Sequence, residues 1–220
     1  MIGKSGSGKS VLMKHINALL VPDSGTVSIK GLNIFDMHYA ELRRIRQMFG
    51  ILFQGGALFD SITAFENVAF PLRYFSNYSE SEIRDRSLHC LEQVNLADIG
   101  DKTTAELSGG MRKRVGLARA IVLEPECLLY DEPTSGLDPE TSDEINDLII
   151  RMAEDLEITS IVVTHDMHSV LRVADKVAFI DKQKLSWYGT LDDMQVADHQ
   201  DLQRFISASE YQINKTGVHS

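Results

Sequence analysis

Eight residues near the start of the chain carry the clearest chemical signal. Residues 3–10 read GKSGSGKS, which fits the pattern G-x-x-x-x-G-K-[ST]. Glycines in this pattern let successive backbone N–H groups converge on phosphate oxygens, and a following helix directs its positive end at them. Lys9 is placed to reach the β- and γ-phosphates, and the Ser10 hydroxyl to bind Mg²⁺. The segment predicts a phosphate-binding loop. The alternative, a chance Gly/Ser turn, is disfavoured by the helical pattern that follows at once.

A carboxylate pair that could serve such a loop follows a short apolar run. Residues 128–132 read Leu-Leu-Tyr-Asp-Glu. Asp131 is expected to bind Mg²⁺ through water, and Glu132 to orient and deprotonate an attacking water. Alone, the pair could equally be surface acids at a strand end. Beside a phosphate loop the catalytic interpretation is favoured.

A second anion-binding pattern lies at residues 107–111, Leu-Ser-Gly-Gly-Met, just before a helical pattern that begins at Arg112. A serine N-cap and two glycines at a helix start present free backbone N–H groups to an anion. One triphosphate needs one such site, so the second predicts a nucleotide held by a partner subunit. The alternative is an ordinary serine N-cap after a loop.

The elements that must position these residues follow from periodicity and end signals. A helix is expected over 9–20, where Leu12, Ile16, Leu19 and Leu20 have helical spacing. Further helices are expected over 79–94, where a capping box marks the start, over 112–124, and from 138 onward. Strands are expected over 127–130 and 158–164, and a hairpin over 177–180 and 185–188. Residues 26–34 also have the composition of a strand, which Gly31 interrupts. Alternating strands and helices predict an α/β fold with a parallel sheet.

Composition sets the outer limits. The 220 residues carry 22 basic and 32 acidic side chains, a net charge of −10, which disfavours nucleic-acid binding. Hydrophobic residues make up 43%, enough for a packed core, and apolar runs are too short for a membrane helix. The two cysteines, Cys90 and Cys127, indicate no disulfide framework.

The order of the motifs resembles that of ATP-binding-cassette (ABC) ATPases, the cytoplasmic motors of membrane transporters, over nearly the whole chain. Further segments that carry the resemblance are 53–55 (FQG), 135–138 (SGLD) and 164–166 (THD). The resemblance implies one domain with a P-loop NTPase fold. Its RecA-like core would cover 1–54 and 127–206, an inserted helical signature subdomain 55–126, and a tail 207–220, with a truncated antiparallel β region.

The resemblance also implies a role for each matching position. Glu132, His165 and Lys9 would be catalytic, and Ser10, Gln54 and Asp131 would hold Mg²⁺. Ser108, Gly109 and Gly110 would contact the nucleotide of the opposite subunit, with Asp138 at the dimer interface. The implied ATP-binding residues are Gly3, Ser5, Gly6, Ser7, Gly8, Lys9, Ser10, Val11, Gln54, Asp131, Glu132 and His165.

The implied function is hydrolysis of Mg-ATP by a head-to-tail homodimer that drives a permease at the cytoplasmic face of the inner membrane. Residues 53–60, residues 65–73 and Met111 resemble the Mla branch, which serves MCE-type phospholipid transporters. That branch implies an MlaE-type permease, an MCE substrate-binding protein and a small cytoplasmic accessory protein. The alternatives are an ATPase of an amino-acid or other small-solute importer, a soluble ABC ATPase and a non-hydrolysing subunit. Nucleic acid is not an expected partner.

Four further expectations concern particular segments. Relatives in the resembled family have about 30 residues before the phosphate loop, including a strand and an adenine-stacking aromatic residue, so an N-terminal truncation with weakened folding and ATP affinity is expected. Basic residues 112–114 are expected to face solvent or the opposite subunit. The phenylalanines at 49, 53, 59, 65 and 70 are expected either in the core or along a groove for the permease. The chain beyond Leu202 is expected to be loosely held.

Overall fold

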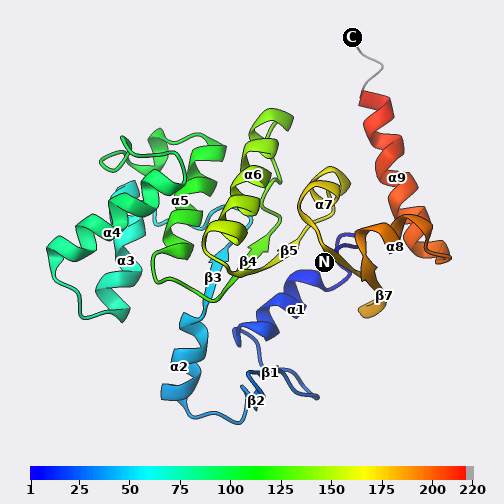
Figure 1. The fold of residues 1–220 in the computed structure, drawn as a ribbon, viewed down its shortest axis with the longest axis horizontal. Helices are drawn as coiled ribbons and strands as arrows, with labels where there is room; N and C mark the ends of the chain where they lie inside the picture. The colour runs from blue at the N-terminus through cyan, green and yellow to red at the C-terminus, as the bar shows by residue number, and fades with distance from the viewer. Residues whose placement is uncertain (217–220) are drawn as a thin grey trace.

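A three-stranded parallel sheet lies at the centre of the protein, in the order β3 (Phe49–Leu52), β4 (Cys127–Asp131) and β5 (Thr159–Val163). This computed structural model describes the backbone of residues 1–216 and the side chains of residues 1–209. Leu52 lies opposite Tyr130, and Tyr130 opposite Val162, so the three strands end at one edge (Figure 1). The predicted α/β fold with a parallel sheet is confirmed.

The central strand β4 is apolar on both faces because helices cover both sides of the sheet. Leu129 packs with Met13 of α1 (Lys9–Ile16) and with Val163. Leu128 and Tyr130 face the opposite way, into the main core shared with α5 (Gly109–Ile121) and α6 (Pro139–Asp155). This alternation fixes the register of β4, so Asp131 and Glu132 emerge at a defined point of the edge.

Helices gather at one end of the molecule (Figure 1). They are α3 (Ala64–Phe75), α4 (Glu80–Gln93), the short 3₁₀ helix η1 (Thr104–Glu106) and α5. Ser79 and Glu82 form the capping box predicted for α4, and Ser108 caps α5 by accepting a hydrogen bond from the Met111 N–H. These helices lie within 55–126, the range predicted for the inserted helical subdomain, and that division of the chain remains a prediction.

The other end holds the hairpin β6 (Lys176–Asp181) and β7 (Lys184–Thr190), with α7 (Met167–Val173), α8 (Leu191–Val196) and α9 (Gln200–Thr216). The first two residues connect this end to the sheet. The Thr164 N–H donates to the Met1 carbonyl, and the Ile2 N–H donates to the Ala178 carbonyl. Met1 and Ile2 thereby anchor the backbone that leads directly into the phosphate loop. Beside them a cavity of about 640 Å³ separates β5 from β6.

The remaining elements are small. The strand composition at 26–34 forms the two-stranded antiparallel β1 (Ser28–Ile29) and β2 (Leu32–Asn33), which turn at Gly31, and α2 (Tyr39–Gln47) leads into β3. In the part of the chain that the structure describes, no helix is long and apolar enough to cross a membrane.

Three expectations about helices are wrong. The helix predicted over 9–20 ends at Ile16, and Leu12 and Leu19 lie exposed instead of on a buried face. The helix predicted to end at residue 124 ends at Ile121. The chain beyond Leu202 is not loose as far as the side chains are described, because Leu202 and Phe205 of α9 are buried against the β6 hairpin region.

Of the basic residues at 112–114, Arg112 is exposed as expected, whereas Lys113 and Arg114 differ from expectation. Lys113 is 4% exposed and lies inside the molecule, whereas Arg114 pairs with Glu144 of α6. The reason is that α5 packs against β3 and the main core along most of its length, so the side of the helix that carries Lys113 faces inward.

Gly50 of β3 provides a test of how tightly α5 packs on the sheet. A Cβ at this position would lie 2.3 Å from the Ala120 carbonyl oxygen and 2.5 Å from Leu128 Cδ2. Gly50→Ala should lower the free energy of unfolding by about 1–3 kcal/mol. Gly55→Ala is the control, since nothing lies within 4 Å of a Cβ there. Denaturant unfolding checks both, and equal stabilities would contradict the packing described.

Candidate functional site

The candidate site lies where parallel segments end together. Gln54 follows β3, Glu132 follows β4 and His165 follows β5, so the sheet brings three distant residues to one edge. The phosphate loop begins directly after the pairing of Ile2 with Phe179 and joins the same edge. In open α/β sheets, ligands bind at the carboxyl ends of the strands. The parallel sheet therefore brings together Gln54, Glu132 and His165, which are far apart in the sequence.

Two glycines give the phosphate loop its shape. Gly3 has φ +149°, and a Cβ there would lie 2.2 Å from the Ile180 carbonyl oxygen, so a side chain is excluded by both backbone and space. Gly8, with φ +101°, is the N-cap of α1. The first N–H groups of α1 have no partner within the helix and point toward the loop, which makes this end of α1 an anion-binding position.

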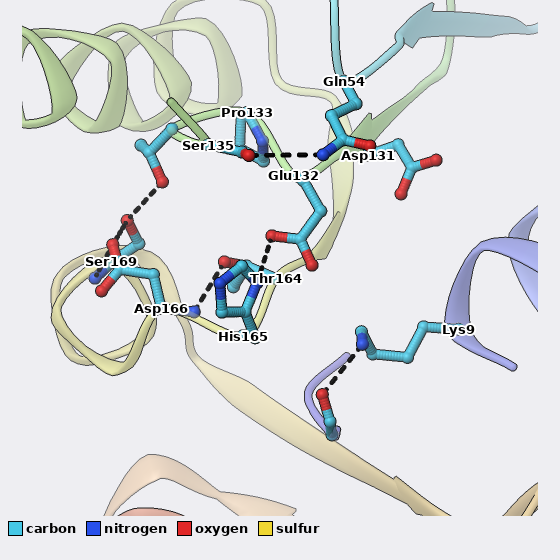
Figure 2. A network of polar contacts seen from close by, with 12 residues as sticks. Lys9, Gln54, Asp131, Glu132, Pro133, Ser135, Thr164, His165, Asp166 and Ser169 are labelled. Atoms are coloured by element: carbon cyan, nitrogen blue, oxygen red, sulfur yellow. Dashed lines mark hydrogen bonds and ion pairs between the residues drawn. The ribbon is translucent and has the colours of Figure 1, made fainter. Parts of the chain in front are cut away.

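Lys9 is the buried cation of this loop, with 6% of its surface exposed. Its Nζ donates hydrogen bonds to the carbonyls of Gly3 (2.8 Å) and Lys4 (3.2 Å). Figure 2 shows the Lys9 side chain and a dashed line from its Nζ to a backbone carbonyl. Burial lowers the pKa of Lys9, and the nearby carboxylates of Glu132 and Asp131 oppose that shift. The ammonium is thereby held inside the loop with donor capacity left for one further acceptor.

Ser10 and Asp131 lie side by side, because the Ser10 hydroxyl donates to Asp131 Oδ1 at 2.7 Å. A hydroxyl, a carboxylate and the amide oxygen of Gln54, which lines the same cavity as Ser10, are the hard oxygen ligands that Mg²⁺ prefers. The donor set therefore fits the cation predicted for these residues.

Glu132 and His165 point toward one another in Figure 2, and His165 Nδ1 lies 2.8 Å from Glu132 Oε2. Glu132 adopts φ +51°, the left-handed conformation, which costs a residue with a side chain about 1–2 kcal/mol. Its N–H donates to the Val163 carbonyl at 2.8 Å. Strain of this kind is found at functional sites, where the surrounding structure enforces it.

A cavity of about 720 Å³ connects these groups. Most of the predicted nucleotide-binding residues line it, and Gln54 is further fixed by a hydrogen bond from its Nε2 to Ser135 Oγ (3.3 Å). Gly3, Ser7 and Asp131 are not among its lining residues. The lining residues are Lys4, Ser5, Gly6, Gly8, Lys9, Ser10, Val11, Gln54, Glu132, His165, Arg204, Phe205, Ala208 and Ser209.

Sequence reasoning did not name Lys4 as an ATP-binding residue, and it missed the last four of these, which belong to α9. The available signal was the pair Leu202 and Phe205, whose spacing of three residues puts both on one helix face. It also missed Ser169, a fully buried residue of α7. The Ser169 hydroxyl bonds to Asp166 and to Asn146 Nδ2 (3.1 Å) and lies 3.3 Å from Thr134 Oγ1.

The signature residues 108–110 and Asp138 do not line this cavity. Ser108 caps α5, and a Cβ on Gly110 would lie 2.5 Å from Thr141 Cγ2, so this segment packs against the start of α6. Asp138 caps α6 by accepting hydrogen bonds from the N–H and hydroxyl of Thr141, which lowers its pKa. The proposed contact of this segment with a second nucleotide remains a prediction.

The contact between His165 and Glu132 leads to a prediction. If His165 helps to hold reacting groups in the cleft, His165→Ala should lower the rate of nucleotide hydrolysis by about 10²-fold. The matched control is His168→Ala, because His168 also pairs with a carboxylate, Asp143 (2.7 Å), but does not line the cavity. Steady-state phosphate release measures both, and equal losses would contradict a specific role for His165.

Comparison with known families supplies independent evidence. The family model described as ABC transporter matches residues 1–135. A curated relative, the probable ribonucleotide transport ATP-binding protein mkl of Mycobacterium leprae, is 40% identical over 207 residues, 94% of this chain and 60% of its own. The methionine import ATP-binding protein MetN of Rhodopseudomonas palustris is 43% identical over 209 residues, which cover 94% of this chain and 56% of MetN. The chain thus spans less than two thirds of the length of these relatives.

Solved structures show the same likeness. The ATP-binding cassette MJ0796, in a dimeric post-hydrolysis state bound to ADP and Pi, superposes with a TM-score of 0.78 at 33% identity, covering 86% of this chain and 83% of that one. The cbiO1 protein of Clostridium perfringens, part of an ABC transporter complex, gives a TM-score of 0.80 at 31% identity and covers 98% and 84%.

Proposed function

Because the chain belongs to the ABC transporter family, we propose that it hydrolyses ATP and supplies the motor subunit of an ABC transporter. The observation that carries the proposal is the Glu132–His165 contact beside the phosphate loop, in one cavity large enough for a nucleotide. A phosphate cradle alone would support binding. The Glu132 carboxylate, which lines the same cavity as the phosphate loop, adds a group that can activate water.

The chemistry proposed for this cleft is in-line attack of water on the γ-phosphate. The loop amides and Lys9 bind the phosphates, Glu132 accepts the proton of the attacking water, and His165 holds the γ-phosphate and Glu132 in place. Mg²⁺, held by Ser10, Asp131 and Gln54, would neutralise phosphate charge. The bond from the γ-phosphorus to the bridging oxygen breaks, which gives ADP and phosphate. Positioning and electrostatics carry most of the effect.

Two copies are proposed to meet head to tail, each completing the other's site with residues 108–110. Two facts support this. Those residues form a capped helix start that does not line the chain's own cavity, and the backbone N–H groups of Gly109 and Gly110 bond to no other described residue. The post-hydrolysis cassette that superposes on this chain is described as dimeric.

A row of exposed aromatic rings, the aromatic strip, is the proposed contact for a membrane permease. It consists of Phe59, Phe70, Tyr74 and Phe75, with ring centroids 4.9, 5.4 and 5.8 Å apart in that order. Asn67, fully buried, fixes it by bonding to the N–H and carbonyl of Phe59. Contact of the aromatic strip with a permease would hold the subunit at the cytoplasmic face of the inner membrane.

The cargo class proposed first is a small solute taken up by an importer. The support is the similarity to proteins named for methionine import and ribonucleotide transport. Phospholipid transport with an MlaE-type permease and an MCE protein is the second candidate, supported by residues 53–60, residues 65–73 and Met111. Uptake of labelled methionine, compared with phospholipid exchange between vesicles, in membranes that contain the complete complex would separate the two.

The motor proposal is tested by phosphate release from purified protein at rising protein concentration, with and without Mg²⁺. Head-to-tail sites predict a specific activity that increases with concentration until the dimer is saturated. Chelation of Mg²⁺ should abolish the activity. Activity that is insensitive to the chelator would contradict the assignment of Ser10 and Asp131, and absence of hydrolysis at any concentration would contradict the motor function.

A further inference from the structure

Lys113 is a buried cation of α5 that the mechanism above does not use. Its ammonium group has three N–H donors. They go to the carbonyls of Pro133 (2.5 Å), Ser135 (2.8 Å) and Glu132 (3.3 Å). Every hydrogen bond found for this side chain among the described residues therefore ends on one loop, the segment 132–135 that follows β4.

Other contacts also hold this loop, since the Glu132 N–H donates to the Val163 carbonyl and Gln54 Nε2 donates to Ser135 Oγ. Lys113 differs from them because it reaches three of the loop's carbonyls at once. Glu132 is in the left-handed conformation with φ +51°, and Pro133 has no N–H to donate. The loop's own hydrogen bonds include one from the Ser135 N–H to the Glu132 carbonyl at 3.2 Å. Buried carbonyls without a partner cost about 1–3 kcal/mol each, so the Lys113 ammonium stabilises this loop shape over alternatives.

The opposite side of the loop is held by α7. Thr134 Oγ1 lies 3.3 Å from the Ser169 hydroxyl, in a polar group that also contains Asn146. The segment 132–135 is thus fixed between two helices, α5 through Lys113 and α7 through Ser169. Loss of one side would leave the other in place, so the loop would shift locally while the fold persists.

We propose that Lys113 is a positioning residue for Glu132 and that it ties the helix carrying residues 108–110 to the loop of the hydrolytic base. Lys113 lies three residues beyond Gly110 on the same rigid helix. A shift of α5 when residues 108–110 engage a nucleotide would therefore be transmitted to the Glu132 carbonyl and side chain. The inference rests on the proposed function, because Glu132 needs precise placement only if it activates water.

The electrostatics agree with a charged clamp. Burial lowers the pKa of Lys113 to about 8, and the negative charge of Glu132 opposes that shift. At neutral pH the ammonium form, with all three donors, predominates and matches the three carbonyls.

The test compares Lys113→Met, which keeps the side-chain length but removes the donors, with Lys113→Gln, which keeps two N–H donors. Lys113→Met should lower kcat by about 10- to 100-fold, the scale of a small misplacement, with KM for ATP unchanged within twofold. Lys113→Gln should recover part of kcat. The matched control, Arg114→Met, removes the neighbouring cation that pairs with Glu144, and its kcat should stay within twofold.

A second measurement does not depend on hydrolysis. Hydrogen exchange at the amides of residues 134–137 should be faster in both Lys113 variants, while the amides of β4 keep their protection. If the wild-type protein does not hydrolyse ATP, the motor function fails, and this exchange pattern still decides whether Lys113 holds the loop.

Several results would overturn the proposal. One is unchanged kcat and loop exchange in Lys113→Met. Another is a parallel loss of kcat, ATP affinity and unfolding midpoint, which would indicate a purely structural lysine. If Lys113→Met does not fold, Lys113→Gln decides, and normal kcat with normal loop exchange in that variant would likewise contradict the clamp.

Discussion

Glu132→Gln should lower ATP hydrolysis by about 10²- to 10⁴-fold while ATP binding persists, because the amide cannot accept the proton of the attacking water. The change preserves side-chain size, so the strained backbone at Glu132 and the contact with His165 Nδ1 can remain. Lys9, Ser10 and the loop amides, which bind the phosphates, are untouched. A binding-competent, hydrolysis-deficient protein is therefore the expected result.

The measurement is single-turnover phosphate release alongside equilibrium titration with a fluorescent ATP analogue. Glu154→Gln, the same substitution at an exposed position of α6, is the control and should leave both values unchanged. Hydrolysis by Glu132→Gln within tenfold of wild type would assign the general base to another group. A parallel loss of ATP affinity would instead give Glu132 a binding role.

Lys9→Ala should lower the affinity for ATP by about 150-fold or more. The substitution removes a charge-assisted hydrogen bond to phosphate, which contributes about 1.5–3 kcal/mol, or roughly 10- to 150-fold in affinity. It also leaves the carbonyls of Gly3 and Lys4 without the donor that now fixes the loop. The loop would lose its shape as well as its cation, so the measured loss should reach or exceed the upper value.

Nucleotide titration monitored by calorimetry measures this effect. Lys14→Ala, on the same helix but outside the lining of the cavity, is the matched control. Circular dichroism should show the fold retained, since Lys9 contacts the loop and not the core. An ATP affinity within twofold of wild type in Lys9→Ala would contradict the assignment of the 720 Å³ cavity as the nucleotide site.

The helix caps and strand ends were predictable because their causes are local. Ser79 with Glu82, and Asp138 with Thr141, form caps whose partners lie three residues apart, so the sequence contains the whole interaction. The phosphate loop is local in the same way, since its glycines and its helix follow one another directly. The parallel sheet followed from the alternation of strand and helix patterns.

Helix lengths and exposed faces were less predictable. Leu12 and Leu19 have helical apolar spacing, yet they lie exposed, because the face of α1 that packs on the sheet is the one with Met13. Periodicity indicates which residues could share a face, but the neighbouring elements decide which face is buried. The same reason explains α9. Its polar composition is typical of a loosely held tail, but Leu202 and Phe205 are buried because they pack against a hydrophobic cluster that includes Phe179 and Val177 of β6.

The sequence by itself determined the chemistry available to this protein: a phosphate loop, an acidic strand end, a second anion-binding helix start, and the order that identifies the family. Only the tertiary structure decided which of these groups meet. The contact between Glu132 and His165 spans 33 residues, and the one between Ser10 and Asp131 spans 121. Lys113 is chemically identical to a surface lysine until α5 packs inward. Long-range contacts depend on how the whole chain packs, and a local sequence pattern does not contain that information.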